Sequence, residues 1–299
     1  MNDADKKKVS FRQKNSTKCP VCSFEFYREE LFSGGGRLIA GKLTDELRRK
    51  YEDNKKFGKI YPLAYQLSVC PNCLYAAYPK DFTQLLPDES EKLRGLTQAR
   101  RGAIGKFFNT DLNFGSDRDL HLGAASYLLA IECYSIRNKK VAPTFKNAVS
   151  AIRAAWLFND LAEAEPEKQY KKMSMFFYQK AYQYYVKVLD LIQNGAEPSE
   201  AAGNMGPDTD KNWGYDGILY LSSLLTLKVG AWEKDINKKI ASFEISKRYL
   251  SRLFGMGKSS KSRPSEILDK TRDLYDKITS AVDEWNKQLA QESQAIEDA

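Results

Sequence analysis

The hydrophobic pattern of the chain changes near residue 85. Before this point the apolar runs are short and interrupted by glycines, and after it apolar residues recur every three or four positions. This spacing places them along one face of an α-helix, so we predict a mostly α protein. Prolines at expected helix starts and glycines at expected helix ends separate the helices. They are predicted at residues 88–108, 117–138, 143–164, 167–194, 213–229, 234–254 and 265–291.

The helix predicted at 167–194 carries two apolar stripes. The stripes are Met173, Phe177, Ala181, Tyr184 and Val188 on one face and Met175, Tyr178, Tyr182, Tyr185 and Leu189 on the other. A helix with two apolar faces must be covered on both, as happens in stacked helical hairpins. The small and aromatic residues nearby resemble tetratricopeptide (TPR) helices, although no strict period of about 34 residues is present. We therefore predict a TPR-like stack of antiparallel helical hairpins over residues 86–299.

The N-terminal part has a different organisation. Residues 1–18 are polar and Lys-rich without periodicity, and they are predicted to be a disordered basic tail. Residues 19–85 combine cysteines, glycines and aromatic residues, and are predicted to be a zinc-ribbon-like metal-binding segment. Within this segment we expect a helix at about 44–56 and a strand at 61–70 that leads into the second cysteine pair.

Four cysteines form two Cys-Pro-x-Cys pairs separated by 47 residues: Cys19 with Cys22, and Cys70 with Cys73. Two such pairs brought together present four thiolates in a tetrahedron, which fills the coordination sphere of zinc and leaves no position for water or substrate. We predict one structural zinc ion, which stabilises small metal-binding domains by ~10–16 kcal/mol. A disulfide, a redox-active thiol pair and an iron site are the alternatives for the same residues.

Residues suited to catalysis are sparse. His121 is the single histidine of the chain, so a Ser-His-Asp or Cys-His arrangement would have to include it. Gly36, Gly41 and Lys42 match part of a phosphate-binding loop. Leu43 stands where such a loop needs Ser or Thr to hold magnesium. We therefore predict a protein that is not an enzyme and has no catalytic residues, with a nucleotide-dependent enzyme as a weaker alternative.

The chain is basic, with a net charge of +8 and a pI of about 9.0. Much of the excess lies in Lys228–Arg263, which contains ten Lys or Arg residues and three acidic residues. Lys247, Arg248 and Arg252 align on one face of a predicted helix. This patch suits nucleic-acid phosphates, but a solvated helix face has the same composition.

The segment 206–217 differs from its surroundings because it joins turn residues to Trp213 and Tyr215. Such a loop is either a tight connector between helices or a recognition surface. Trp213 and Tyr215, together with the three basic residues above, are the candidate partner-binding residues.

The motifs together resemble a known family. CPVC and CPNC, followed by Cys-Leu-Tyr-Ala-Ala, SYLLAIECY, AIRAAWLFNDL and KAYQYY, are similar to a bacterial family catalogued as domain of unknown function 2225. The resemblance covers about 17–230, and the region 234–291 lies outside it. It implies a four-cysteine, zinc-ribbon-like segment followed by TPR-like helices. The implied zinc ligands are the same four cysteines. Leu74 stands where the family commonly has glycine.

These features favour a protein-binding function. The chain has no run of eighteen apolar residues and no secretory signal, so we expect a cytoplasmic protein. We predict a non-enzymatic, zinc-stabilised adaptor or scaffold whose helical array binds a protein or peptide partner. The alternative is a nucleic-acid-binding protein that uses the ribbon and the basic patches.

Overall fold

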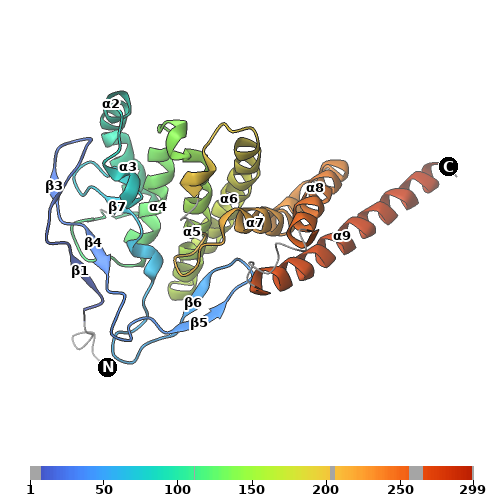
Figure 1. Ribbon diagram of the computed structural model, residues 1–299, viewed down its shortest axis with the longest axis horizontal. Helices are drawn as coiled ribbons and strands as arrows, with labels where there is room; N and C mark the ends of the chain where they lie inside the picture. Colours follow the sequence, from blue (N-terminus) through green and yellow to red (C-terminus); the bar gives the residue numbers. More distant parts are fainter. Residues whose placement is uncertain (1–7, 111, 203–205, 256–264, 298–299) are drawn as a thin grey trace.

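The protein divides into a β-rich N-terminal segment and a long succession of helices (Figure 1). The computed structural model describes residues 8–110, 112–202, 206–255 and 265–297. In these ranges every strand lies before Pro87 and every long helix lies after it, which confirms a mostly α fold with a small four-cysteine segment. The helices are α1 (Pro79–Phe82), α2 (Pro87–Gly95), α3 (Thr97–Phe108), α4 (Leu120–Tyr134), α5 (Pro143–Ala164), α6 (Tyr170–Gln193), α7 (Gly214–Val229), α8 (Ile236–Gly255) and α9 (Ser265–Glu297), with the 3-10 helices η2 (Pro62–Tyr65), η3 (Lys139–Val141), η4 (Ser199–Ala202) and η5 (Gly230–Trp232).

Local sequence signals set several of the helix boundaries. The predicted helix 143–164 is observed as α5, where Pro143 occupies the first turn. The predicted helix 117–138 begins later, at Leu120, because Asp119 accepts a hydrogen bond of 2.7 Å from the Leu122 N–H. The predicted helix 88–108 is interrupted at Leu96, which gives α2 and α3.

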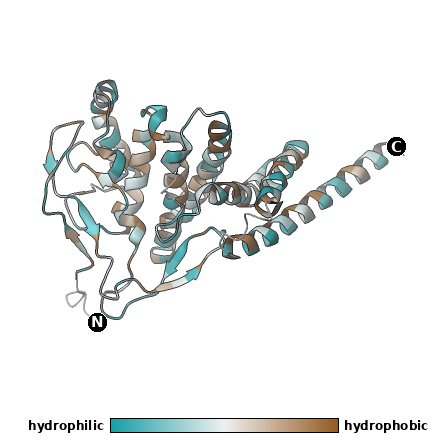
Figure 2. Ribbon diagram, in the orientation of Figure 1, coloured by the Kyte–Doolittle hydropathy of each residue, from teal (hydrophilic) through white to brown (hydrophobic). Residues whose placement is uncertain are grey.

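Consecutive helices from α4 to α9 pack against one another. Helix α5 is the most enclosed, since α4 and α6 cover it on two sides, and Trp156 at its centre is 1% exposed. Helix α6 lies between α5 and α7, as its two stripes predict, but Met175 of the second stripe is 43% exposed. Figure 2 shows that the outer end of α9 is largely hydrophilic where it leaves the body of the molecule. No helix among the described residues combines the length and apolar character needed to cross a bilayer.

The described part of the N-terminal segment, from residue 8 onward, contains four separate two-stranded antiparallel sheets. They are β1 (Ser10–Arg12) with β4 (Glu29–Leu31), β2 (Thr17–Lys18) with β3 (Glu25–Phe26), β5 (Ala40–Leu43) with β6 (Arg49–Tyr51), and β7 (Ser68–Val69) with β8 (Ala76–Ala77). The expected tail is therefore shorter than predicted, because Ser10 is buried and donates to Glu29. Residues 1–7 lie outside the described residues. The expected strand at 61–70 is replaced by η2 followed by β7.

The helix predicted at 44–56 is wrong. This region forms the β5–β6 hairpin, whose tip, Thr44–Arg48, enters the helical array. The Thr44 N–H donates to the Arg48 carbonyl, and Leu47 adopts a φ of 59° between them. Leu47 is fully buried. Tertiary contacts at the tip override the local preference for helix.

The hairpin tip contacts four helices. The Glu46 carboxylate accepts hydrogen bonds from Trp156 Nε1 of α5 and from Tyr178 OH of α6, and it pairs with Lys228 of α7. Asp45 pairs with Lys270 of α9 at 3.0 Å. Segments separated by more than 100 residues in sequence are therefore joined at this point.

Buried apolar side chains of the N-terminal segment and of the helices belong to one continuous core. Gly123 of α4 marks the closest approach, since a Cβ at this position would lie 2.7 Å from the Ala64 Cβ of η2. The change from strands to long helices falls between β8 and α2.

Candidate metal centre

The two cysteine pairs lie in two turns of the same geometry. The first turn joins β2 to β3, where the Cys19 N–H donates to the Phe24 carbonyl and the Ser23 N–H donates to the Cys19 carbonyl, both at 2.9 Å. Ser23 has a φ of 61°. Each turn aims both of its cysteine side chains toward the same point.

The second turn, between β7 and β8, repeats this pattern. The Cys70 N–H donates to the Tyr75 carbonyl, and the Leu74 N–H donates to the Cys70 carbonyl, again at 2.9 Å. Leu74 has a φ of 58°, so the left-handed position that favours glycine is occupied by a larger residue in both turns.

The four sulfur atoms all lie within 4.8 Å of one another. Cys19 Sγ is 3.6 Å from Cys73 Sγ, and Cys22 Sγ is 3.6 Å from Cys70 Sγ. Four bonds of about 2.3 Å at tetrahedral angles would place the sulfurs of a zinc site about 3.8 Å apart. A disulfide needs about 2.05 Å, and all four cysteines are free thiols. The predicted ligands therefore form a cluster that fits a single metal ion.

The cluster is enclosed and its thiols are coupled. Cys19, Cys70 and Cys73 are buried, and Cys22 is half-buried. Hydrogen bonding from the thiols of Cys70 and Cys73 lowers the pKa of Cys19 to about 4, and the interaction with Cys19 raises the pKa values of Cys70 and Cys73. A metal that takes all four sulfurs as thiolates must therefore displace protons when it binds.

Three arginines from α2 and α3 hold the backbone of the two turns. Arg94 Nε donates to the Val21 carbonyl at 2.8 Å, and Arg101 donates to the Asn72 carbonyl. Arg100 is fully buried and donates to the Cys73 carbonyl at 3.1 Å. Four thiolates around a divalent cation carry a net charge of −2. The positive charges of these guanidinium groups partly neutralise this negative charge and stabilise the metal-bound centre. Sequence analysis missed them, because long-range contacts to backbone carbonyls leave no motif.

Comparison with known proteins supports the resemblance that the motifs indicate. Residues 13–278 match the family described as an uncharacterized protein conserved in bacteria (DUF2225). The chain belongs to the DUF2225 family. An uncharacterized protein of Borreliella burgdorferi (strain ATCC 35210 / DSM 4680 / CIP 102532 / B31) is 44% identical over 275 residues, which span 91% of this chain and 97% of that protein. No solved structure matches the chain. The DUF2225 match ends at residue 278 within α9, so residues 234–278 of the region that the motifs leave outside are part of the match.

The candidate partner-binding residues differ in their exposure to solvent. Trp213 is 6% exposed and packs beneath Lys211, whose Nζ lies 4.4 Å from the centre of its ring. It is therefore part of a helix connector and offers little surface to a partner, whereas Tyr215 is 38% exposed. Trp213 is buried because it begins α7 against the body of the protein.

The three basic residues of α8 also differ from one another. Arg248 and Arg252 are exposed, but Lys247 is half-buried and pairs with Glu244 at 3.1 Å. The Ser-rich stretch at 257–263 lies outside the described residues.

The remaining reactive residues have structural partners. His121 Nε2 lies 2.8 Å from Glu165 Oε1. Cys133 is buried in the core, and burial raises its pKa to about 11. The glycines at 36 and 41 precede or lie in strand β5 rather than starting a helix, so the segment lacks the helix N-terminus with which a phosphate-binding loop holds its ligand.

Proposed function

We propose that this DUF2225 protein is a zinc-stabilised adaptor that binds an acidic, amphipathic segment of a partner protein and has no catalytic activity of its own. Zinc is the proposed metal because four cysteine sulfurs form its preferred closed structural site. A set of four protein ligands offers no open position for substrate, so the metal has a structural role.

Zinc binding can be tested in the full chain. Elemental analysis of protein purified without chelator should give about one zinc per chain. Cys70→Ser should reduce the zinc content to less than about half, and Cys133→Ser should leave it unchanged, since Cys133 lies in the core outside the cluster. Iron in place of zinc, or equal zinc in the two variants, would contradict the proposal.

The observation that carries the adaptor proposal is an apolar surface on α6 and η5. We call Met175, Phe176, Val186 and Trp232 the α6 face; each is more than 40% exposed. A groove of about 420 Å³ runs beside it and is lined by residues of α6 and by Trp232. Clustered exposed apolar side chains of this kind are typical of protein-binding surfaces.

The charge around the α6 face defines the partner. Helix α6 carries Lys171, Lys172, Lys180 and Lys187 but only one acidic residue, Asp190. A partner helix with apolar residues on one face and acidic residues beside them matches both properties.

A photo-crosslinking phenylalanine analogue placed at Phe176 tests the adaptor proposal in the bacterium that encodes the chain. We expect one protein to crosslink from this position and not from Leu86, which is equally exposed on another part of the molecule. The purified partner should then bind the chain, and Lys180→Glu with Lys187→Glu should weaken this binding at least tenfold. Lys106→Glu with Lys287→Glu is the matched control, because both lysines are exposed on other helices. Equal affinity of the two double variants would exclude the α6 face.

Nucleic-acid binding is the second candidate, favoured by the exposed pair Arg248 and Arg252 on α8. Binding through phosphates falls steeply with salt, by a slope of about 0.9 per phosphate contact on duplex DNA. We expect no duplex or single-strand binding at ~150 mM salt. Submicromolar binding at that salt, abolished by reversing these two charges, would replace the adaptor proposal.

A further inference from the structure

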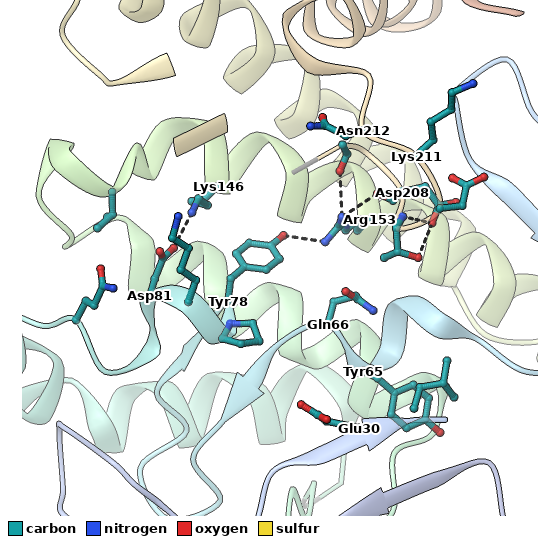
Figure 3. Close-up of a pocket in the computed structure, with 18 of the residues that line it drawn as sticks. Glu30, Tyr65, Gln66, Tyr78, Asp81, Lys146, Arg153, Asp208, Lys211 and Asn212 are labelled. Carbon is teal, nitrogen blue, oxygen red and sulfur yellow. Dashed lines mark hydrogen bonds and ion pairs between the residues drawn. The ribbon is translucent and has the colours of Figure 1, made fainter. Parts of the chain in front are cut away.

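A cavity of about 860 Å³ lies between the N-terminal segment and the helices, away from both the cysteine cluster and the α6 face. Figure 3 shows Tyr78, Lys146 and Arg153 at its centre, with Asp208 and Lys211 on one side and Asp81 on the other. Lys146 and Arg153 are 3% and 4% exposed. Two cationic side chains are thus held at the floor of a cavity large enough for a small organic ligand.

Most carboxylates around the cavity already have donors from the protein. Asp81 accepts from Tyr134 OH at 2.6 Å and from Lys146 Nζ at 2.7 Å. Asp208 accepts from two backbone N–H groups, those of Arg49 and Thr209. Glu30 accepts a hydrogen bond from Gln13, and Asp210 accepts one from Arg49. Glu200 is the remaining carboxylate among the residues that line the cavity.

The cations of the cavity are less fully neutralised. Arg153 donates to the carbonyls of Pro207 at 2.8 Å and Gly206 at 3.0 Å, and its Nη1 lies 3.4 Å from Tyr78 OH. All of these acceptors are uncharged. Within the described ranges, no carboxylate lies within 4.0 Å of the charged atoms of Arg153, Lys80 or Lys140, which all line the cavity.

Lys80 and Lys146 bring two ammonium groups close to each other at the cavity. Burial lowers the pKa of Lys146, and the neighbouring charge of Lys80 lowers it further. The Lys146 ammonium has three N–H donors and a single carboxylate partner, Asp81, so donors remain for a ligand.

We propose that this cavity binds a small organic phosphate through Lys80, Lys146 and Arg153. Lysine binds phosphate as a point charge with N–H donors. Arg153, whose nitrogens all donate to protein oxygens, contributes its positive charge to the cavity. Tyr65 and Val141 line the same cavity and provide apolar wall for the organic part of the ligand. The site lies on other elements than the α6 face and does not rest on the adaptor function.

Isothermal titration of the full, zinc-loaded chain at low salt tests the proposal, with inorganic phosphate, glycerol phosphate and citrate as the probes. Glycerol phosphate should bind more tightly than inorganic phosphate, because it also contacts the apolar wall, and citrate should bind more weakly than either. Lys80→Ala should weaken phosphate binding at least tenfold, and Lys80→Arg should restore part of it. The Lys80 side chain is exposed, and no hydrogen bond or ion pair of this side chain occurs among the described residues, so Lys80→Ala should leave the fold intact.

Lys106→Ala is the matched control, and it should bind phosphate as the unmodified chain does. No heat from phosphate in the unmodified chain, or equal affinities of Lys80→Ala and Lys106→Ala, would overturn the proposed site. Tighter binding of citrate than of glycerol phosphate would overturn the assignment to phosphates.

Discussion

At the scale of single residues, each cysteine turn places a residue with a side chain in a backbone conformation that favours glycine. Ser23 and Leu74 both have φ near +60°, where residues with a Cβ are disfavoured by about 1–2 kcal/mol. Ser23 is exposed, whereas Leu74 is 5% exposed and packs in the core. Burial of the Leu74 side chain therefore offsets the cost of its backbone conformation, whereas the exposed Ser23 has no such compensation.

Glycine substitutions separate the cost of the left-handed backbone from the gain of side-chain burial. Ser23→Gly should raise the free energy of unfolding by about 0.5 kcal/mol, because relief of the left-handed strain exceeds the extra entropy of the unfolded chain. Leu74→Gly should lower it by about 2 kcal/mol through lost burial. Urea denaturation of the zinc-loaded chain measures both changes. A destabilised Ser23→Gly variant would show that the strain is not significant.

Trp156 combines packing with a polar contact. Its indole is 1% exposed, and its Nε1 donates to Glu46 of the hairpin tip. Trp156→Ala should lower the free energy of unfolding by ~3–5 kcal/mol, because it leaves a cavity in α5. Trp156→Phe keeps most of the packing and should cost about half as much. Equal effects of the two variants in chemical denaturation would mean that the hydrogen bond, not the ring volume, dominates.

At the scale of elements, Glu89 links the start of α2 to the loop before α5. It accepts hydrogen bonds from the N–H groups of Leu86 and Asn138 and lies 3.2 Å from Arg137 Nε. Burial tends to raise its pKa, but these hydrogen bonds outweigh burial and leave the pKa below the usual 4.5. The stabilisation is thus present above pH 4.5 and is lost as the pH falls through the lower, folded-state pKa.

Glu89→Gln should lower the free energy of unfolding by about 2 kcal/mol at neutral pH, where the carboxylate is charged. The difference from the unmodified chain should shrink as the pH falls below 4.5 and Glu89 takes up a proton in the folded protein. Denaturation midpoints measured from pH 3 to pH 7 check this dependence. A difference that stays constant with pH would show that the charge of Glu89 contributes nothing.

Elements set by local rules could be predicted from sequence, and those set by distant contacts could not. Pro143 defines the start of α5, and this signal is a single residue. Each cysteine pair is also a local signal, because its two cysteines are three positions apart, and the repeated pair predicts the cluster. The hairpin tip was predicted as helix because its partners, Trp156 and Lys228, are far away in sequence. The cavity around Arg153 was missed for the same reason, since its walls come from five separate segments.

At the scale of the whole molecule, the metal-binding segment and the helices share their stability. One apolar core runs through both, and Arg94, Arg100 and Arg101 fasten the cysteine turns to α2 and α3. We therefore expect a single cooperative thermal transition for the zinc-loaded chain. Removal of zinc by a chelator should lower the midpoint of this transition for the helices too. Calorimetry that resolves two independent transitions, with only one sensitive to chelator, would contradict this expectation.

The hairpin tip also determines when the protein can finish folding during its synthesis. Cys73 follows Cys19 by 54 residues, whereas Lys270 follows Asp45 by 225. At about 5–20 residues per second, the metal centre can close within about 3–11 s, but the last partner of the tip emerges from the ribosome only after about 11–45 s. Asp45 therefore stays without its Lys270 partner until α9 has been made, and the contacts of the hairpin tip are completed after the metal centre has closed.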